Sequence, residues 1–102
     1  MLTWNVTYHC KKGLREAFYK ALCELGIREN SQKEEGNLGY NYYFAAEVPD
    51  DLLLVESWTS PELLQAHCRT EIFAKLQALK AQFCIGVDIE KFNSGVDRNT
   101  PN

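Results

Sequence analysis

The sequence has no apolar run near the roughly 20 residues that a membrane-spanning helix needs, and no charged N-terminal region followed by an apolar signal core. It also has no basic stripe, because 11 lysines and arginines are scattered among 14 aspartates and glutamates, which leaves a net charge of −3. A scattered charge argues against nucleic acid as a partner. We therefore expect a protein of the cytoplasm whose partners include neither a membrane nor a nucleic acid.

Repeats, low-complexity tracts and internal linkers are absent from the 102 residues as well. A chain of this length buries roughly two-thirds of its unfolded surface, which is enough for one hydrophobic core. We expect a single domain over residues 1–92, followed by a polar tail over residues 93–102.

Motifs for metals and dinucleotides are missing too. The four cysteines form no Cys-x-x-Cys pair, and the two histidines are not spaced to complete a zinc site. A chain with a normal aromatic and aliphatic core has little need of disulfides, so we expect reduced thiols and no metal. Gly36-Asn37-Leu38-Gly39 leads into a predicted strand rather than a helix, so it is not a dinucleotide-binding loop.

The hydrophobic pattern predicts strands and helices in the order β-α-β-β-α-β. The strands are predicted over residues 2–9, 38–44, 52–58 and 85–89. A first helix is predicted over residues 14–25, and the second helical segment, over residues 61–83, comprises the helix with His67 and another helix that opens at Thr70. This order is typical of an α+β, ferredoxin-like fold, in which helices cover one face of a four-stranded antiparallel sheet.

The third strand and the helix after it bring a carboxyl group, an indole and an imidazole toward one interior. The strand ends in Glu56-Ser57-Trp58, and Ser60-Pro61 is a favourable helix start. His67 lies on the same side of this helix as Leu63-Leu64, so it should face inward. Glu56 and His67 then either form a buried pair that satisfies two polar groups, or line a cavity in which His67 transfers a proton.

Alternation along the strands divides the sheet into two faces. The more apolar face, which we place under the helices, comprises Trp4, Val6, Tyr8, Tyr40, Tyr42, Leu54, Glu56 and Trp58. The other face comprises Thr3, Asn5, Thr7, Asn41, Tyr43, Leu53, Val55 and Phe92. Two helical segments cover only one face, so the second face stays exposed unless another sheet meets it. This predicts a homodimer packed sheet to sheet.

Aromatic side chains gather on the face under the helices. The cluster comprises Tyr8, Tyr40, Tyr42, Trp58 and Phe73. Buried tyrosine hydroxyls need hydrogen-bond partners, which is costly in a plain core but useful around a flat ligand with polar edges. The cluster therefore predicts either a small-molecule cavity or a core whose hydroxyls reach the rim.

Several of these motifs recur together in one family. The strand ending in Glu56-Ser57-Trp58, the helix start Ser60-Pro61-Glu62-Leu63-Leu64 with its histidine, and the next helix opening at Thr70-Glu71-Ile72-Phe73 resemble the antibiotic biosynthesis monooxygenase family. Members are small dimeric α+β barrels. Gly13 and the stretch from Glu34 to Tyr40 agree with the same family, and the resemblance runs from Leu2 to Phe92.

The resemblance implies a homodimer that oxidises a phenolic or quinol-type substrate with molecular oxygen and without metal, flavin or haem. It implies that His67, backed by Glu56, is the base that deprotonates the substrate. The side chains implied in substrate binding are Trp4, Tyr8, Tyr40, Tyr42, Trp58 and Phe73.

The sequence departs from the family at Ile72, where many members have a second histidine, so a two-histidine proton relay is not expected. Haem-degrading relatives use an asparagine and a histidine where this chain has Val6 and the neighbourhood of Gln77, which excludes haem degradation. Another branch isomerises a small phosphorylated signalling molecule, but the sequence reveals no phosphate-binding lysine or arginine in the pocket. An isomerase, a non-catalytic binding protein and a scaffold within a larger assembly stay as alternatives.

Overall fold

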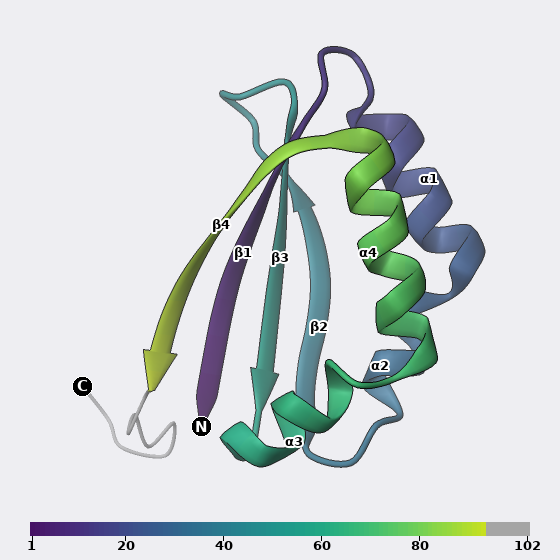
Figure 1. Ribbon diagram of the computed structural model, residues 1–102. Coiled ribbons are helices and arrows are strands. Elements are labelled where there is room, and N and C mark those ends of the chain that lie inside the picture. Colours follow the sequence, from purple (N-terminus) through teal and green to yellow (C-terminus); the bar gives the residue numbers. More distant parts are fainter. Residues whose placement is uncertain (94–102) are drawn as a thin grey trace.

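The computed structural model describes residues 1–93 of the chain. Its antiparallel sheet has the strand order β2-β3-β1-β4, and the helices lie on one side of it (Figure 1). The elements in chain order are β1 (Leu2–Cys10), α1 (Arg15–Leu25), α2 (Ile27–Gln32), β2 (Asn37–Phe44), β3 (Asp51–Trp58), α3 (Pro61–His67), α4 (Glu71–Phe83) and β4 (Cys84–Asn93). The predicted α+β, ferredoxin-like class is confirmed.

Helix α2 was not predicted, so the element order is β-α-α-β-β-α-α-β. Gly26 adopts the left-handed conformation, with φ of 66°, which ends α1 and turns the chain into α2. Only Ile27 and Ser31 are buried in α2. Two buried positions in a single short helix give no periodic signal that a sequence pattern can detect.

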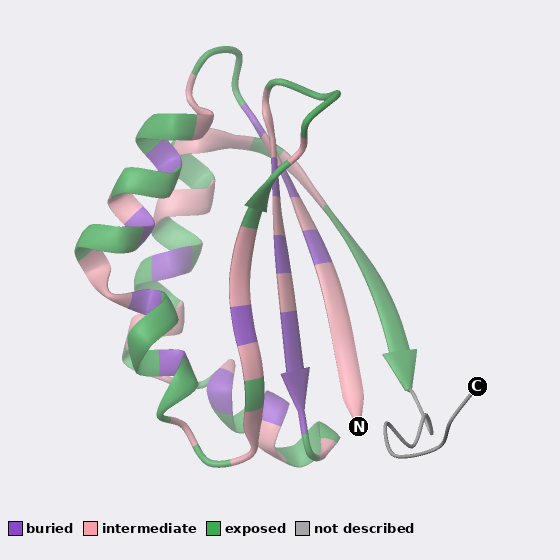
Figure 2. Cartoon of the chain, turned by 180° about the vertical axis from the view of Figure 1, so that it is seen from behind, coloured by how far each residue is buried: buried purple, intermediate pink, exposed green. Residues whose placement is uncertain are grey.

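Burial confirms the division of the sheet into two faces. On the inner face Tyr8, Leu54 and Trp58 are at most 2% exposed, whereas Tyr43 and Phe92 on the outer face are 52% and 45% exposed. Buried and less buried residues alternate along β1 and β3 (Figure 2). The outer face of a single chain is thus uncovered, and the homodimer that would cover it stays a prediction.

Strand β4 diverges from the helices toward its far end (Figure 1), and most of its residues are exposed (Figure 2). It begins directly where α4 ends, at Cys84, and runs beyond the predicted residue 89 to Asn93. The last residues of β4, Lys91 to Asn93, are exposed and pair with the start of β1. Of the predicted polar tail, only Asn93 is described, and residues 94–102 lie outside the described residues.

His9 links three strands on the outer face. Its Nδ1 lies 2.7 Å from Asp51 Oδ1 of β3, and its Nε2 lies 2.6 Å from Asp88 Oδ2 of β4. All four cysteines are free. Within residues 1–93, no helix has the length and apolar character needed to cross a membrane.

Candidate active site

His67 is held at the end of α3 by the caps of two helices. Ser60 Oγ accepts a hydrogen bond from the Leu63 amide at 3.3 Å and so caps α3. At the other end, Thr70 Oγ1 donates to the His67 carbonyl at 2.8 Å and accepts from the Phe73 amide at 3.2 Å. These bonds fix the short turn between α3 and α4. The imidazole, only 1% exposed, faces inward as predicted.

The carboxylate bound to His67 is that of Glu34. Its Oε1 and Oε2 lie 3.0 and 3.1 Å from His67 Nδ1. The predicted hydrogen-bonded pair of Glu56 and His67 is therefore wrong. Because Nδ1 lies against a carboxylate, we assign the imidazole hydrogen to Nδ1. Nε2 has no hydrogen-bond partner within the described residues and is free to accept a proton.

A glycine turn brings Glu34 to His67. Gly36 has φ of +83°, which L side chains rarely adopt, and its carbonyl accepts a hydrogen bond from the Thr59 amide at 2.9 Å. A Cβ at position 36 would overlap Leu63 Cδ1 of α3. The turn therefore packs directly on the helix that carries His67.

Glu56 is buried on β3 and bound to Trp58. Trp58 Nε1 donates to Glu56 Oε1 at 2.9 Å. Burial raises the pKa of Glu56, while the hydrogen bond from Trp58 and the charge of His67 oppose the rise. Glu56 thus keeps its proton to a higher pH than an exposed glutamate does, and in that form it can donate a hydrogen bond.

Three aromatic rings surround the imidazole of His67. The centroid of Trp58 lies 4.9 Å away at an interplanar angle of 36°, and those of Phe73 and Tyr40 lie 5.5 and 5.8 Å away in edge contacts. Such contacts fix the plane of the imidazole and keep water from most of its surface.

A cavity of about 50 Å³ lies beside His67, between the sheet and α4. Its walls bring together six of the predicted site residues, namely Trp4, Tyr8, Tyr40, Glu56, His67 and Phe73. A site for one water needs about 10–15 Å³ of such space, so the cavity holds a few waters or a diatomic molecule but not an aromatic ring. An aromatic ligand must therefore extend beyond it.

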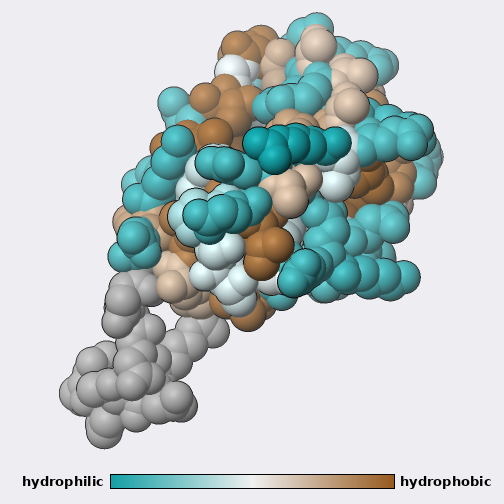
Figure 3. Space-filling model, turned by 60° about the horizontal axis from the view of Figure 1, so that its bottom comes forward, coloured by the Kyte–Doolittle hydropathy of each residue, from teal (hydrophilic) through white to brown (hydrophobic). Residues whose placement is uncertain are grey.

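A wider hollow of about 430 Å³, here called the vestibule, adjoins this cavity. Trp4 and Cys68 form walls of both spaces, and the vestibule continues between α3 and the end of β4, where Leu64 and Lys91 line it. Figure 3 turns this end of the molecule toward the viewer and shows apolar side chains exposed between hydrophilic ones. Cavity and vestibule together reach the size that small-molecule sites usually have.

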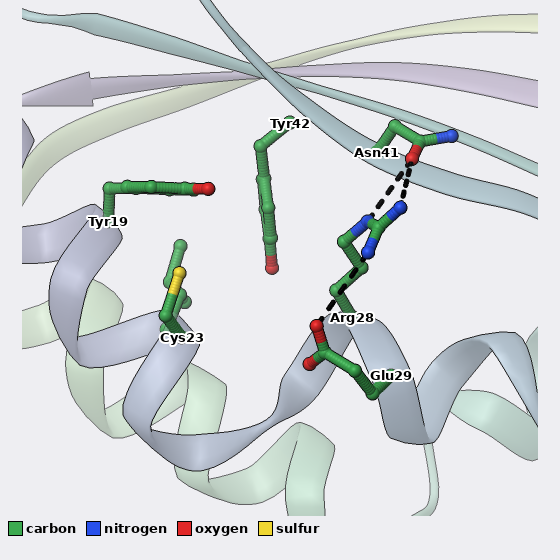
Figure 4. A pocket seen from close by; sticks show the side chains of 7 residues that line it. Tyr19, Cys23, Arg28, Glu29, Asn41 and Tyr42 are labelled. Carbon is green, nitrogen blue, oxygen red and sulfur yellow. Dashed lines mark hydrogen bonds and ion pairs between the residues drawn. The ribbon is translucent and has the colours of Figure 1, made fainter.

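Two predicted substrate-binding residues are not brought to the cavity. Trp58 is fully buried against His67 and forms no part of the cavity wall. Tyr42 lines a separate pocket of about 230 Å³ between α1, α2 and β2 (Figure 4). In that pocket Arg28 is already bound, through Nε and Nη2, to Asn41 Oδ1 at 3.1 and 3.0 Å, and it lies 3.7 Å from Glu29.

Two buried donors at the cavity wall lack a hydrogen-bond partner in the described part of the chain. They are the Tyr40 hydroxyl and the Trp4 indole N–H. Burial, and then the neighbouring Tyr42, raise the pKa of Tyr40 far above its usual range, so the hydroxyl stays protonated. Tyr40 and Tyr42 influence each other's pKa, but neither hydroxyl forms a hydrogen bond of ordinary geometry. Unsatisfied buried donors are uncommon and indicate a missing acceptor.

Sequence reasoning missed Glu34 as the partner of His67, and it missed two lysines. Lys80 lines the cavity and Lys91 the vestibule, although no lysine was expected there. Lys91 has the strand parity of the inner face, and Lys80 follows the buried Leu76 by four helical positions, so periodicity could have found both. Glu34 lies in a turn, where no periodicity applies. Residues 1–93 contain no cluster of three or more metal-ligating side chains.

The family model of antibiotic biosynthesis monooxygenases matches residues 1–79 of the chain. No curated protein matches this chain. A candidate antibiotic biosynthesis monooxygenase from Nitrosomonas europaea is 21% identical over 94% of this chain and 100% of its own, with a TM-score of 0.84. A conserved protein of unknown function from Bacteroides thetaiotaomicron, described as a possible oxidoreductase, is 28% identical over 89% and 94% of the two chains, with a TM-score of 0.78. None of these descriptions gives a substrate.

Proposed function

Because the chain belongs to the antibiotic biosynthesis monooxygenase family, we propose that its His67 cavity oxidises a small phenolic or quinol-type substrate with molecular oxygen. One observation carries this proposal. The buried imidazole has Nδ1 bound to Glu34, whereas Nε2 is unoccupied, and the ring lies in the wall of an aromatic-lined cavity. This is the arrangement that a general base needs, since one nitrogen is oriented and the other is free.

In the proposed reaction, His67 Nε2 accepts the proton of a substrate hydroxyl, and the Glu34 carboxylate stabilises the imidazolium that forms. Glu34 is 22% exposed and also lines a groove between α2 and α4. This groove shares no wall residue with the vestibule. The proton therefore has a route to solvent that a bound substrate leaves open.

The substrate anion then reduces oxygen. One oxygen atom enters the product and the other leaves as water, so the substrate supplies all four electrons and no external reductant is required. The Tyr40 hydroxyl is a donor at the cavity wall that stabilises negative charge on a reacting oxygen. The aromatic walls limit the access of water to the intermediate.

Oxygen uptake tests the proposal. Purified protein would be given reduced menadione or anthrone, and uptake would be followed by electrode against a control without protein. We expect uptake above the control, and we expect His67→Ala to lower the rate about 10²–10⁴-fold, the usual contribution of a positioned general base. His9→Ala is the matched control, because His9 lies on the outer face, and it should retain the rate. Uptake equal to the control with every such substrate would contradict the proposal.

An isomerase or binding protein for a phosphorylated small molecule is the second candidate. The lysines in the walls of the cavity and the vestibule favour it. Ile72 argues against it, because it leaves His67 without the second histidine of many family members and so without a partner for shuttling protons. Anaerobic conversion of a phosphorylated ligand, without oxygen uptake from any phenol, would replace the first candidate by the second.

A further inference from the structure

Four residues of the inner face form a row across the sheet at the level of the cavity. The strand register places Tyr40 opposite Glu56, Glu56 opposite Trp4, and Trp4 opposite Lys91. Neighbouring strands lie about 5 Å apart, so the backbones of Glu56 and Lys91 are roughly 10 Å apart. The row thus leads from the cavity beside His67 across Trp4 to the vestibule.

Lys91 supplies a positive charge at the vestibule end of this row. Its Nζ lies 4.7 Å from the centroid of the Trp4 ring, which holds the ammonium over the inner face. Within residues 1–93 no carboxylate lies within 4.0 Å of Lys91 or of Lys80. Glu90 has the opposite strand parity and belongs to the outer face. The walls of cavity and vestibule therefore contain two unpaired cations, together with the buried Glu56.

We propose that the natural ligand is an aromatic hydroxy acid, whose hydroxyl reaches His67 while its carboxylate, at the opposite end, binds Lys91 in the vestibule. This deepens the proposed function, on which it rests, by naming the substrate class. The row from Glu56 to Lys91 spans two strand spacings, roughly 10 Å between backbones, and this is the length scale of two fused rings with substituents at both ends. Trp4 lies in the walls of both the cavity and the vestibule, and its unpartnered indole N–H is a donor for which the ligand can supply an acceptor.

One ammonium at the vestibule suits a single negative charge. A phosphate group carries up to two charges and prefers several backbone amides or arginines around it. The vestibule walls contain neither an arginine nor the start of a long helix, since the helix there, α3, has only 7 residues. A carboxylate is therefore favoured over a phosphate ester.

Binding measured without oxygen tests this inference. Calorimetric titrations would compare 2-naphthol, 6-hydroxy-2-naphthoate and 2-naphthyl phosphate at pH 8. We expect the hydroxy acid to bind wild-type protein about tenfold more tightly than 2-naphthol, the usual effect of one charge-assisted hydrogen bond. Lys91→Gln should lower the affinity for the hydroxy acid to about that for 2-naphthol, and Lys91→Arg should retain most of the difference. Lys75→Gln, an exposed lysine of α4 near Glu71, is the matched control and should behave as wild type.

Equal affinities for 2-naphthol and the hydroxy acid in wild-type protein would overturn the inference. An equal loss of affinity for both compounds in Lys91→Gln would also overturn it. Tighter binding of 2-naphthyl phosphate than of the hydroxy acid would overturn it as well. Because no turnover is needed, these results are separate from the fate of the monooxygenase proposal. If binding depends on Lys91 but no oxygen is taken up, only the proposed reaction is refuted. If oxygen is taken up but binding does not depend on the carboxylate, only the proposed ligand class is refuted.

Discussion

The orientation of His67 depends on a residue that lies 33 positions earlier in the chain. Glu34→Ala removes the only hydrogen-bond partner of the buried Nδ1 within the described residues. We expect it to lower the free energy of unfolding by about 1–3 kcal/mol, the cost of leaving a buried polar group unpaired. Urea unfolding followed by tryptophan fluorescence measures the loss. Glu35→Ala, an exposed neighbour, should change stability by less than about 0.5 kcal/mol; equal losses in both variants would show that the ion pair contributes nothing.

Periodicity predicted where side chains point but not which of them meet. Parity places Tyr8, Tyr40 and Glu56 on the inner face, and the structure gathers them in one cavity wall. Tyr42 has the same parity but lies next to α1 and α2, over a different pocket. Trp58 packs against His67 and leaves no surface for a ligand. The face of the sheet on which a side chain lies can be predicted from the alternation along its strand. The residues that this side chain contacts depend on where the helices lie over the sheet.

At the level of elements, the turn before β2 sets the position of Glu34. In Gly36→Ala the new methyl group would clash with the side chain of Leu63, and the backbone has a positive φ. In Gly13→Ala the backbone has a positive φ, but no atom lies near the new methyl group. In Gly39→Ala neither the backbone nor the neighbours oppose the change. We expect Gly13→Ala to cost about 1–2 kcal/mol from the left-handed backbone alone. Gly36→Ala should cost clearly more, and Gly39→Ala should cost least. Thermal unfolding of the three variants measures this order. Equal losses at positions 13 and 36 would contradict the close packing of this turn on α3.

The strands β3, β1 and β4 are linked through His9, and this link should depend on pH. Hydrogen bonds to Asp88, and then to Asp51, raise the pKa of His9 above its ordinary value. A histidine with a raised pKa in the folded state stabilises that state while it is protonated. The contribution of His9 to the free energy of unfolding is complete below its pKa in the unfolded chain, about 6.5. This contribution disappears as the pH rises through the pKa of His9 in the folded protein.

His9→Gln should therefore lower the melting temperature more at about pH 6 than at about pH 9. Asp88→Asn should show the same pH trend with a smaller amplitude, because Asp88 is 81% exposed and Asp51 still binds the imidazole. Melting curves of the three proteins across this range test the prediction. A loss that does not vary with pH would mean that the charge of His9 has no role in stability.

The short helix α2 shows why one element escaped prediction. Its two buried residues give no stripe, and the glycine before it signals the end of α1 equally well whether or not a helix follows. By contrast, α4 has 13 residues, and its inward residues Ile72, Phe73, Leu76 and Leu79 recur at helical spacing. The short helix α3, with 7 residues, was predicted from its start signal Ser60-Pro61. A helix could thus be predicted from a long apolar stripe or from a start signal, and α2 has neither.

For the whole molecule, we predict a homodimer that covers the outer face of the sheet. Tyr43 and Phe92 are exposed on this face, and Leu53 and Val55 are only half-buried. Two such faces would bury roughly 2,000 Å² or more, as obligate dimers do. Light scattering should give twice the chain mass of 11.7 kDa.

Val55→Glu should shift this mass toward the monomer, because a buried unpaired charge at a sheet interface is costly. Val48→Glu is the matched control, since Val48 is 47% exposed in the loop between β2 and β3, and it should stay dimeric. A wild-type protein that is monomeric and folded at micromolar concentration would contradict the dimer.

The proposed reaction is tested most directly by the fate of the two oxygen atoms. Protein and a reduced quinol would be mixed under ¹⁸O₂ in ordinary water, and the mass of the oxidised product would be measured. We predict one ¹⁸O atom in each product molecule, with the other in water, and this labelling should be lost in His67→Ala. A product that carries no ¹⁸O, or one that takes its new oxygen from solvent, would contradict oxygen insertion at the His67 cavity.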